Sequence, residues 1–285
     1  TSIMTAQALL PFAQSQTSTY IALAAFMALL VGVILLFAAL LKLGWIMQFI
    51  SRGVMAAFIT GAALLIMTGQ VKYILGLSVQ GDTLPSLLWA FWQQQTLINS
   101  YALLLGSSAV VVLWLNRRYS IGILKKIKLS TDSASLMTKV IPIVVLIIAS
   151  YAVYQGQLIN HQLAVVGAIP AGLPSFDVPQ WPAWQQWQAL FSSALLIALI
   201  AFISSASVAK SMALQRQESF DANKELLGLG LANISAAFFK GLPITGGFSR
   251  TAVNVEAGAK TPLAGVFSAL VMALVLLVAS DWFYY

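Results

Sequence analysis

One short segment of the sequence combines glycines, a hydroxyl group and a positive charge in a way typical of anion binding. A helical pattern ends at Lys240, and the glycines and proline of residues 241–247 do not favour its continuation. Residues 248–257 then form a stretch about half as long as a straight membrane-spanning helix requires. The residues at the opening of this predicted half-helix are Gly246, Gly247, Phe248, Ser249 and Arg250.

The N-terminus of such a half-helix has the right chemistry for an anion. Its first backbone N–H groups have no partner within the helix, and they lie at the positive end of the helix dipole. Gly246 and Gly247 would let a ligand approach the backbone closely. Ser249 adds a hydroxyl group, and Arg250 adds a charge that costs about 2.5–3.5 kcal/mol at the bilayer centre unless it faces protein or water. The alternative role for Arg250 is that of a structural ion-pair partner.

The beginning of the chain has a similar layout. A short apolar element at residues 2–13 precedes a long apolar stretch at 19–43, just as the half-helix at 248–257 precedes a long stretch at 262–281. An inverted repeat in which each half supplies one broken helix would leave this order. Two half-helix N-termini facing each other near the midplane would form a small, positively polarised site that suits an oxyanion.

These elements belong to a chain whose composition indicates a membrane protein. Sixty per cent of the 285 residues are apolar and 8% are charged, against about 25% charged in soluble domains. Apolar stretches long enough to cross a hydrocarbon core recur along the chain. Including the short first one, we predict eight apolar elements, at 2–13, 19–43, 46–76, 100–115, 138–154, 188–213, 225–239 and 262–281.

The distribution of basic residues predicts an orientation. The connector 116–130 carries five Lys or Arg residues, whereas the connectors 77–98 and 155–187 carry none. Because positive charge marks the cytoplasmic side, connector 116–130 is predicted inside, and connectors 77–98 and 155–187 are predicted outside. The Trp residues of the two outer connectors are typical of an interfacial aromatic belt. The net charge of +7 is therefore explained by topology, and we expect no nucleic-acid partner.

The sequence offers little support for other chemistry. It has no cysteine and a single histidine, His161, so we expect no metal site and no cofactor. No paired carboxylates, histidine cluster or nucleophile with its base falls inside the membrane elements, which argues against an enzyme. The chain starts at Thr1 and stops abruptly after an apolar segment, so we expect it to be a fragment.

Four motifs resemble the sulfate permease family, a group of anion transporters and exchangers. They lie in the same order and with matching spacing at residues 49–58, 166–174, 221–226 and 246–254, the last followed by 258–261. The resemblance implies an all-α polytopic fold of fourteen segments in two inverted repeats of seven, with core and gate domains and two half-helices. It also implies that this chain starts at the third segment, stops in the eleventh, and lacks the cytoplasmic STAS domain usual in the family.

On this map, residues 1–45 and 187–285 belong to the core domain and residues 46–186 to the gate domain. The resemblance places the anion between the N-termini of the third and tenth segments. The corresponding residues here are Thr1, Ser2 and Ile3 on one side and Gly246, Gly247, Phe248 and Ser249 on the other. It further implies a homodimer in the plasma membrane, which is the inner membrane in bacteria.

One position departs from the family pattern. Many bacterial and plant members carry an acidic residue at the position of Ser204, where it is implicated in coupling to H⁺ or Na⁺. Its absence favours exchange, or uptake coupled in another way, over cation symport. Ser204, Ser205 and Ser207 either line the substrate path or serve as small residues that let helices approach closely.

The leading hypothesis is therefore secondary transport of sulfate or a related small anion such as bicarbonate, chloride or a dicarboxylate. Two alternatives remain open: a nucleobase permease of the same architecture and a membrane scaffold that transports nothing.

Overall fold

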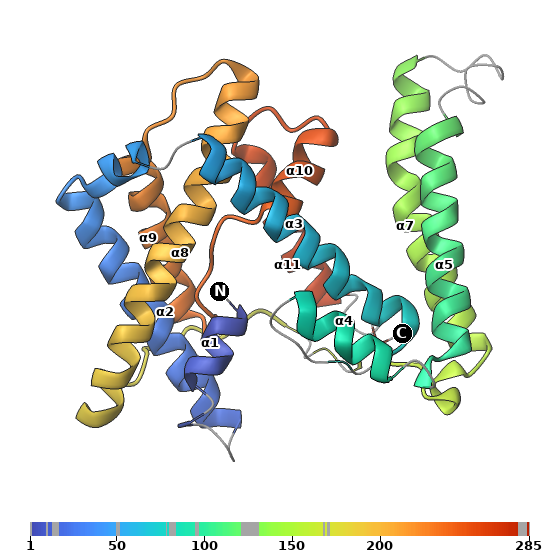
Figure 1. Cartoon of the computed structure of the whole chain (residues 1–285), viewed down its shortest axis with the longest axis horizontal. Coiled ribbons are helices and arrows are strands. Elements are labelled where there is room, and N and C mark those ends of the chain that lie inside the picture. The colour runs from blue at the N-terminus through green and yellow to red at the C-terminus, as the bar shows by residue number, and fades with distance from the viewer. Residues whose placement is uncertain are drawn as a thin grey trace. The chain divides into compact units, whose positions relative to one another are not determined.

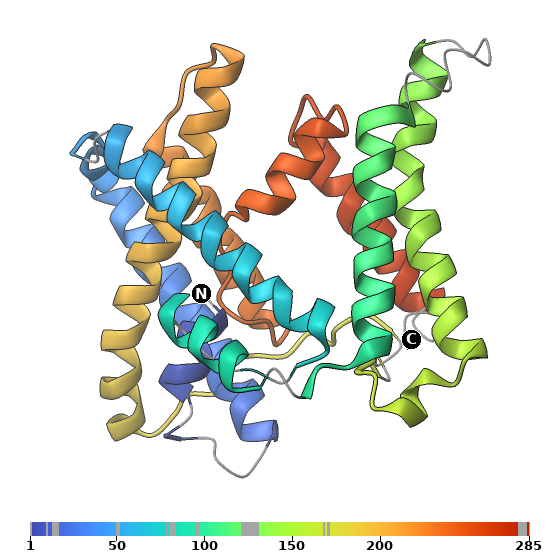
Figure 2. The same ribbon diagram turned by 45° about the vertical axis from the view of Figure 1, so that its right-hand side comes forward.

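Helix is the regular secondary structure among the residues that the computed structural model describes, which are 2–9, 11–12, 17–49, 52–77, 79, 84–94, 97–120, 131–167, 169, 172–278 and 284. By contacts they divide into two compact units, residues 1–57 with 173–265 (unit 1) and residues 58–172 with 266–285 (unit 2). Figures 1 and 2 show the ribbon in two views. The helices are α1 (Ser2–Leu9), α2 (Thr17–Leu40), α3 (Arg52–Leu75), α4 (Leu84–Gln93), α5 (Ser100–Leu115), α7 (Thr131–Gln155), α8 (Trp184–Arg216), α9 (Ala222–Phe238), α10 (Phe248–Glu256) and α11 (Leu263–Val278). Shorter turns of helix are η1 (Leu43–Gln48), η3 (Asn116–Ser120) and η4 (Leu158–His161).

Most predicted apolar stretches coincide with a helix, but two details differ. The stretch predicted as continuous over 46–76 is divided, because residues 43–48 form the 3₁₀ turn η1 and α3 begins only at Arg52. Lys42 has a left-handed backbone (φ 56°), which separates η1 from α2. The connector 77–98, predicted to be outside, contains an additional short helix, α4, with Trp89 and Trp92 near its end.

The core of unit 1 is built by α2, α8 and α9, which pack against one another. Its fully buried side chains include Phe26 and Val31 of α2 and Ile197 of α8. Leu226 of α9 is 2% exposed. The α2 and α9 backbones approach closely where two glycines meet. A methyl group added at Gly32 would lie 2.9 Å from the Gly230 carbonyl oxygen. Small residues thus set the helix spacing, as is common in membranes.

Unit 2 contains the neighbouring helices α5 and α7, which lie side by side in both views (Figures 1 and 2). Asn99 caps α5, because its Oδ1 accepts hydrogen bonds from the N–H groups of Tyr101 and Ala102. Its Nδ2 donates to the carbonyl oxygen of His161, 2.9 Å away, at the end of η4.

Four helical stretches among the described residues are long and apolar enough to cross a membrane, at Thr19–Leu40, Ser100–Ser120, Met137–Gln155 and Gln186–Arg216. The apolar side chains of α5 and α7 are mostly exposed, as expected where lipid is the solvent. The units differ in extent from the domains expected from the sequence: the unit division falls at residues 57/58 and 172/173, and residues 266–285 group with unit 2.

Candidate functional site

The broken helix predicted near the end of unit 1 is present. Helix α10 begins at Phe248, and its N-cap residue Gly247 has an extended backbone (φ −96°, ψ 115°) without a side-chain cap. Nine residues separate Phe238, the last residue of α9, from Phe248. With nine residues of its own, α10 is about 13 Å long at 1.5 Å per residue, less than half of the roughly 30 Å of a hydrocarbon core. It ends at Glu256, one residue earlier than predicted.

A buried asparagine holds the segment that leads into α10. Asn233 of α9 is fully buried, and its Nδ2 donates to the carbonyl oxygens of Leu229 (2.9 Å) and Ile244 (3.0 Å). Its Oδ1 accepts a hydrogen bond from the Ile244 N–H at 2.9 Å. The hydroxyl of Thr245 donates to the carbonyl oxygen of Ala201 in α8 at 2.9 Å. Non-helical backbone at membrane depth thus finds partners within the protein, as it must in lipid.

Helix α8 is the surface against which α10 begins. Gly246 lies so close to Ser205 that an added methyl group would be 3.0 Å from the Ser205 Cα and would collide with its hydroxyl. Ser205 is 5% exposed, and its hydroxyl donates to the carboxylate of Glu225 in the first turn of α9. A side chain at position 246 would therefore push the entry to α10 away from α8.

The other end of α10 is also tied to α8. The Arg216 guanidinium donates to the carbonyl oxygens of Ala259 and Lys260, just beyond α10. Ala201, the partner of Thr245, lies 17 residues after Trp184 and 15 residues before Arg216. The entry to α10 therefore lies near the middle of α8, and the helix extends towards the Arg216 end.

The first half-helix is present as α1, which packs against α8 and α2. Thr5 and Leu9 are its fully buried side chains. Thr1 and the side chain of Ile3 lie outside the described residues, and the Ser2 side chain is exposed. A direct opposition of the α1 and α10 N-termini stays a prediction.

The remaining predicted site residues occupy different environments. Ser204 is half-buried on α8, and Arg250 is exposed on the first turn of α10. The backbone of Phe248 and Ser249 opens α10, and their side chains lie outside the described residues. Ser207 is buried, with its hydroxyl unpaired among the described residues.

Sequence reasoning missed Glu225 as part of this region. The motif at residues 221–226 indicates only the resemblance to the family. Within it, Asp221 caps α9, because its Oδ1 accepts from the N–H groups of Asn223 and Lys224. The signal for Glu225 was an acid at the very start of an apolar stretch, but nothing in the sequence shows that it reaches Ser205.

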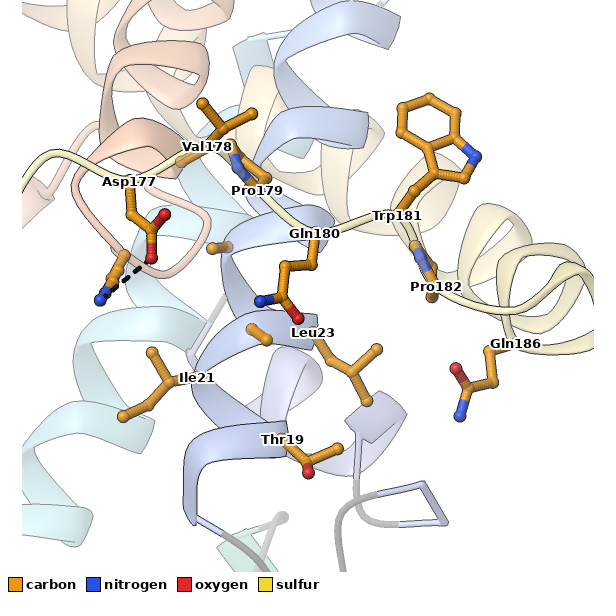
Figure 3. Close-up of a pocket in the computed structure, with 14 residues that line it drawn as sticks. Thr19, Ile21, Leu23, Asp177, Val178, Pro179, Gln180, Trp181, Pro182 and Gln186 are labelled. Atoms are coloured by element: carbon orange, nitrogen blue, oxygen red, sulfur yellow. Dashed lines mark ion pairs between the residues drawn. The ribbon is translucent and has the colours of Figure 1, made fainter.

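The larger of the two cavities described in unit 1, of 480 Å³, lies elsewhere. It is lined by the first turns of α2, the loop of residues 177–182 and the end of α9 (Figure 3). Asp177 and Lys240 form an ion pair of 3.1 Å in it, and the edge-to-face pair of Trp181 and Phe26 holds the loop on α2. Since Asp177 already neutralises Lys240, the cavity offers no unpaired positive charge to an anion.

Together, the fold and the two short helices define an integral membrane protein with the broken-helix architecture of secondary transporters. The Sulfate permease family model matches residues 1–285, and the chain belongs to that family. This is a family of transporters rather than enzymes.

Curated relatives agree with the family assignment. "Sulfate transporter 4.1, chloroplastic" of Arabidopsis thaliana is 29% identical over 287 residues, covering 100% of this chain and 40% of the relative. "Putative sulfate transporter YvdB" of Bacillus subtilis is 34% identical, covering 91% of this chain and 46% of the relative. The chain thus spans less than half the length of these relatives.

A solved structure supports the fold. The transmembrane domain of the cyanobacterium bicarbonate transporter BicA superposes with a TM-score of 0.72 at 21% identity, over 99% of this chain and 68% of that domain. The all-helical fold predicted from the sequence is therefore confirmed as part of this transmembrane fold.

Proposed function

We propose that this chain is the substrate-binding part of a secondary transporter for sulfate or a related small anion, which binds at the N-terminus of α10. One observation carries the proposal: α10 begins beside the middle of the long helix α8, and its N-cap residue is a glycine, so it has no side-chain cap. The first N–H groups of α10 lack intrahelical acceptors, so an anion can serve as their partner.

The surroundings of this N-terminus suit a negative charge. The helix dipole places partial positive charge there, and Arg250 lies in the first turn. The entry segment is fixed by Asn233 and Thr245, so the N–H groups are held in place before the ligand arrives. Such preorganisation lowers the entropic cost of binding. In this proposal Thr1, Ser2 and Ile3 of the first half-helix approach the anion from the opposite side, and Ser204 lines the site from α8.

The proposal extends to the whole transporter. Unit 1, which contains both short helices, acts as the core domain, and the helices of unit 2 contribute to the gate domain. Transport then consists of a movement of core against gate, in an elevator or rocking manner. The complete protein is a homodimer with a cytoplasmic STAS domain outside this chain, and it resides in the plasma membrane, which is the inner membrane in bacteria.

The names of two relatives support a small oxyanion as the substrate. Their names specify sulfate for the plant protein and bicarbonate for the structural relative, and both are compact oxyanions. Because Ser204 replaces the acid that many relatives carry, we propose exchange rather than symport with a cation at that position.

Flux measurements on the complete protein test the proposal. Reconstituted into liposomes, it should take up labelled sulfate, bicarbonate, chloride or a dicarboxylate, and excess unlabelled anion should compete. Arg250→Gln should reduce uptake, whereas Lys224→Gln, at an exposed site in α9, should leave it unchanged. Lack of uptake of every anion in this panel would contradict the proposal.

A nucleobase permease is the second candidate because the architecture would be shared. Arg250 beside an open helix N-terminus favours an anion over a neutral base. Competition by uracil for anion uptake, or uracil uptake itself, would favour the second candidate.

A further inference from the structure

Glu225 is a carboxylate beside the entry to α10. It lies in the first turn of α9, half-buried, and its Oε1 contacts the hydroxyl of Ser205. That hydroxyl in turn lies against Gly246, two residues before α10 begins. Residue 204 of α8 is a serine, whereas the neighbouring helix α9 carries an acid, Glu225. The Ser205 hydroxyl lies between that carboxylate and the entry to α10, where the anion is proposed to bind.

The hydroxyl of Ser205 has a single proton to donate. An ionised carboxylate only accepts hydrogen bonds, so ionised Glu225 engages that proton and Ser205 has none for another acceptor. A protonated Glu225 instead donates its own proton to the Ser205 oxygen. The Ser205 proton can then rotate away from Glu225 and towards the backbone entry at Gly246.

The elements packed against α9 are α2, α8 and η1. Helix α2 contributes the titratable Tyr20 and no charged residue, and η1 contributes none. Helix α8 carries Lys210 and Arg216, and α9 with its cap residue carries Asp221 and Lys224 besides Glu225. Lys42 precedes η1, and α10, which packs against α8, carries Arg250 and Glu256. Asp221 is engaged in capping and Arg216 in holding the residues after α10. Glu225 is thus the carboxylate among them that contacts α8 at the entry to α10.

We infer that Glu225 and Ser205 form a proton-controlled hydrogen-bond donor for the anion at the N-terminus of α10. A hydronium ion of the solvent gives one proton to the Glu225 carboxylate as an anion binds, and it leaves as water. The new O–H donates to Ser205 Oγ, and the Ser205 O–H donates towards the anion. No other covalent bond is made or broken. This inference rests on the proposed function and adds to it a dependence of anion binding on a proton at Glu225 of α9.

The sign of the pH effect follows from charge. An ionised Glu225 repels an incoming anion and occupies the Ser205 proton, whereas a protonated Glu225 does neither. Anion binding should therefore tighten as pH falls. A hydrogen bond to a charged group contributes on the order of tenfold or more in affinity, and we expect a change of that size between alkaline and acidic pH.

Sulfate and chloride binding to the purified complete protein, followed by tryptophan fluorescence or calorimetry across pH, tests the inference. Both anions keep a constant charge over this range, so any pH dependence belongs to the protein. Glu225→Gln should bind with an affinity independent of pH, close to that of the wild type at acidic pH. The control Glu218→Gln, in the exposed connector before α9, should keep the wild-type pH dependence.

Ser205→Ala provides an independent readout. It should lower affinity about tenfold at acidic pH, where the wild-type hydroxyl is available, and change it little at alkaline pH, where that hydroxyl is already engaged. A mere packing role for Ser205 would lower affinity equally at every pH. This variant also decides the question if Glu225→Gln fails to fold.

The outcomes separate the two proposals. Binding that is independent of pH in the wild type, an unchanged pH dependence in Glu225→Gln, or an equal loss at all pH values in Ser205→Ala would overturn the inference while leaving the anion site in place. Absence of binding and of flux for every anion tested would overturn the proposed function and the inference with it.

Discussion

At the scale of single residues, the entry to α10 depends on side chains that are small or fully paired. Gly246 allows the chain to lie directly on Ser205 of α8. Asn233 supplies both donor and acceptor for the extended segment, with no exposure to solvent. A break in a membrane helix is costly wherever its backbone groups lack partners. These two residues therefore make the break at Gly247 compatible with the membrane interior.

Gly246→Ala should destabilise unit 1 and impair anion binding. The added methyl group would lie 3.0 Å from the Ser205 Cα, a backbone atom that cannot rotate away, and overpacking of this kind costs about 1–3 kcal/mol. Thermal unfolding in detergent and anion uptake in liposomes measure the two effects. Gly228→Ala in α9 is the matched control, because an added methyl group there meets no atom within 4 Å. Equal behaviour of the two variants would contradict the tight contact.

Asn233→Ala should also lower stability. It leaves the N–H of Ile244 without its acceptor and two carbonyl oxygens without their donor, and an unsatisfied buried group costs about 1–3 kcal/mol. Thermal unfolding of Asn233→Ala and of Ser235→Ala, an exposed site on the same helix, provides the comparison. A melting temperature as high as that of the control would mean that the Asn233 contacts contribute little.

At the scale of elements, α10 is held along one half of α8. Its entry is fixed near Ala201 and Ser205, and the residues after it are fixed by Arg216. Helix α1 packs against the same helix, so α8 supports both short helices. A nine-residue helix is too short to be stable alone. Its orientation, and that of its N–H groups, therefore depends on α8.

Arg216→Ala should loosen the C-terminal end of α10 while leaving its start in place. We expect faster hydrogen exchange of the backbone amides of residues 254–258 and slower anion uptake. The melting temperature should change little, because Arg216 is exposed. Lys260→Ala is the control, since only its backbone carbonyl takes part in the contact with Arg216. Unchanged exchange in Arg216→Ala would show that α10 is held by packing alone.

At the scale of the whole molecule, the arrangement of charge and apolar surface defines the environment. Large exposed side chains such as Leu104, Ile147 and Val271 would be unfavourable in water but are ordinary in lipid. Basic residues gather in the connectors predicted to be cytoplasmic, and α8 runs from the Trp-rich connector predicted to be outside to the basic side.

The predicted orientation can be measured with single cysteines, because the chain contains none. Ser175→Cys, in the outer connector, should react with a membrane-impermeant maleimide added to intact cells. Ser219→Cys, after α8, should react only once the membrane is opened. Both side chains are exposed, so burial cannot explain a difference. The reverse labelling pattern would invert the topology.

The sequence by itself determined the class of protein, most of the helices and the break before α10. Apolar length and helix-breaking residues act locally, so they can be read without knowing what packs against them. The start of α10 at Phe248 and the cap at Asp221 follow from such local preferences. The start of α3 and the helix α4 were not predicted, because an apolar run does not reveal where a turn interrupts it.

Only the tertiary structure decided which side chains meet. The pairs Ser205–Glu225, Asn233–Ile244 and Arg216–Lys260 are separated by 20, 11 and 44 residues. Whether they touch depends on how far each helix is rotated and shifted against its neighbours, which close contacts such as that of Gly32 with Gly230 establish. Helix packing is therefore what brings the Glu225 carboxylate of α9 to Ser205 of α8, beside the entry to α10.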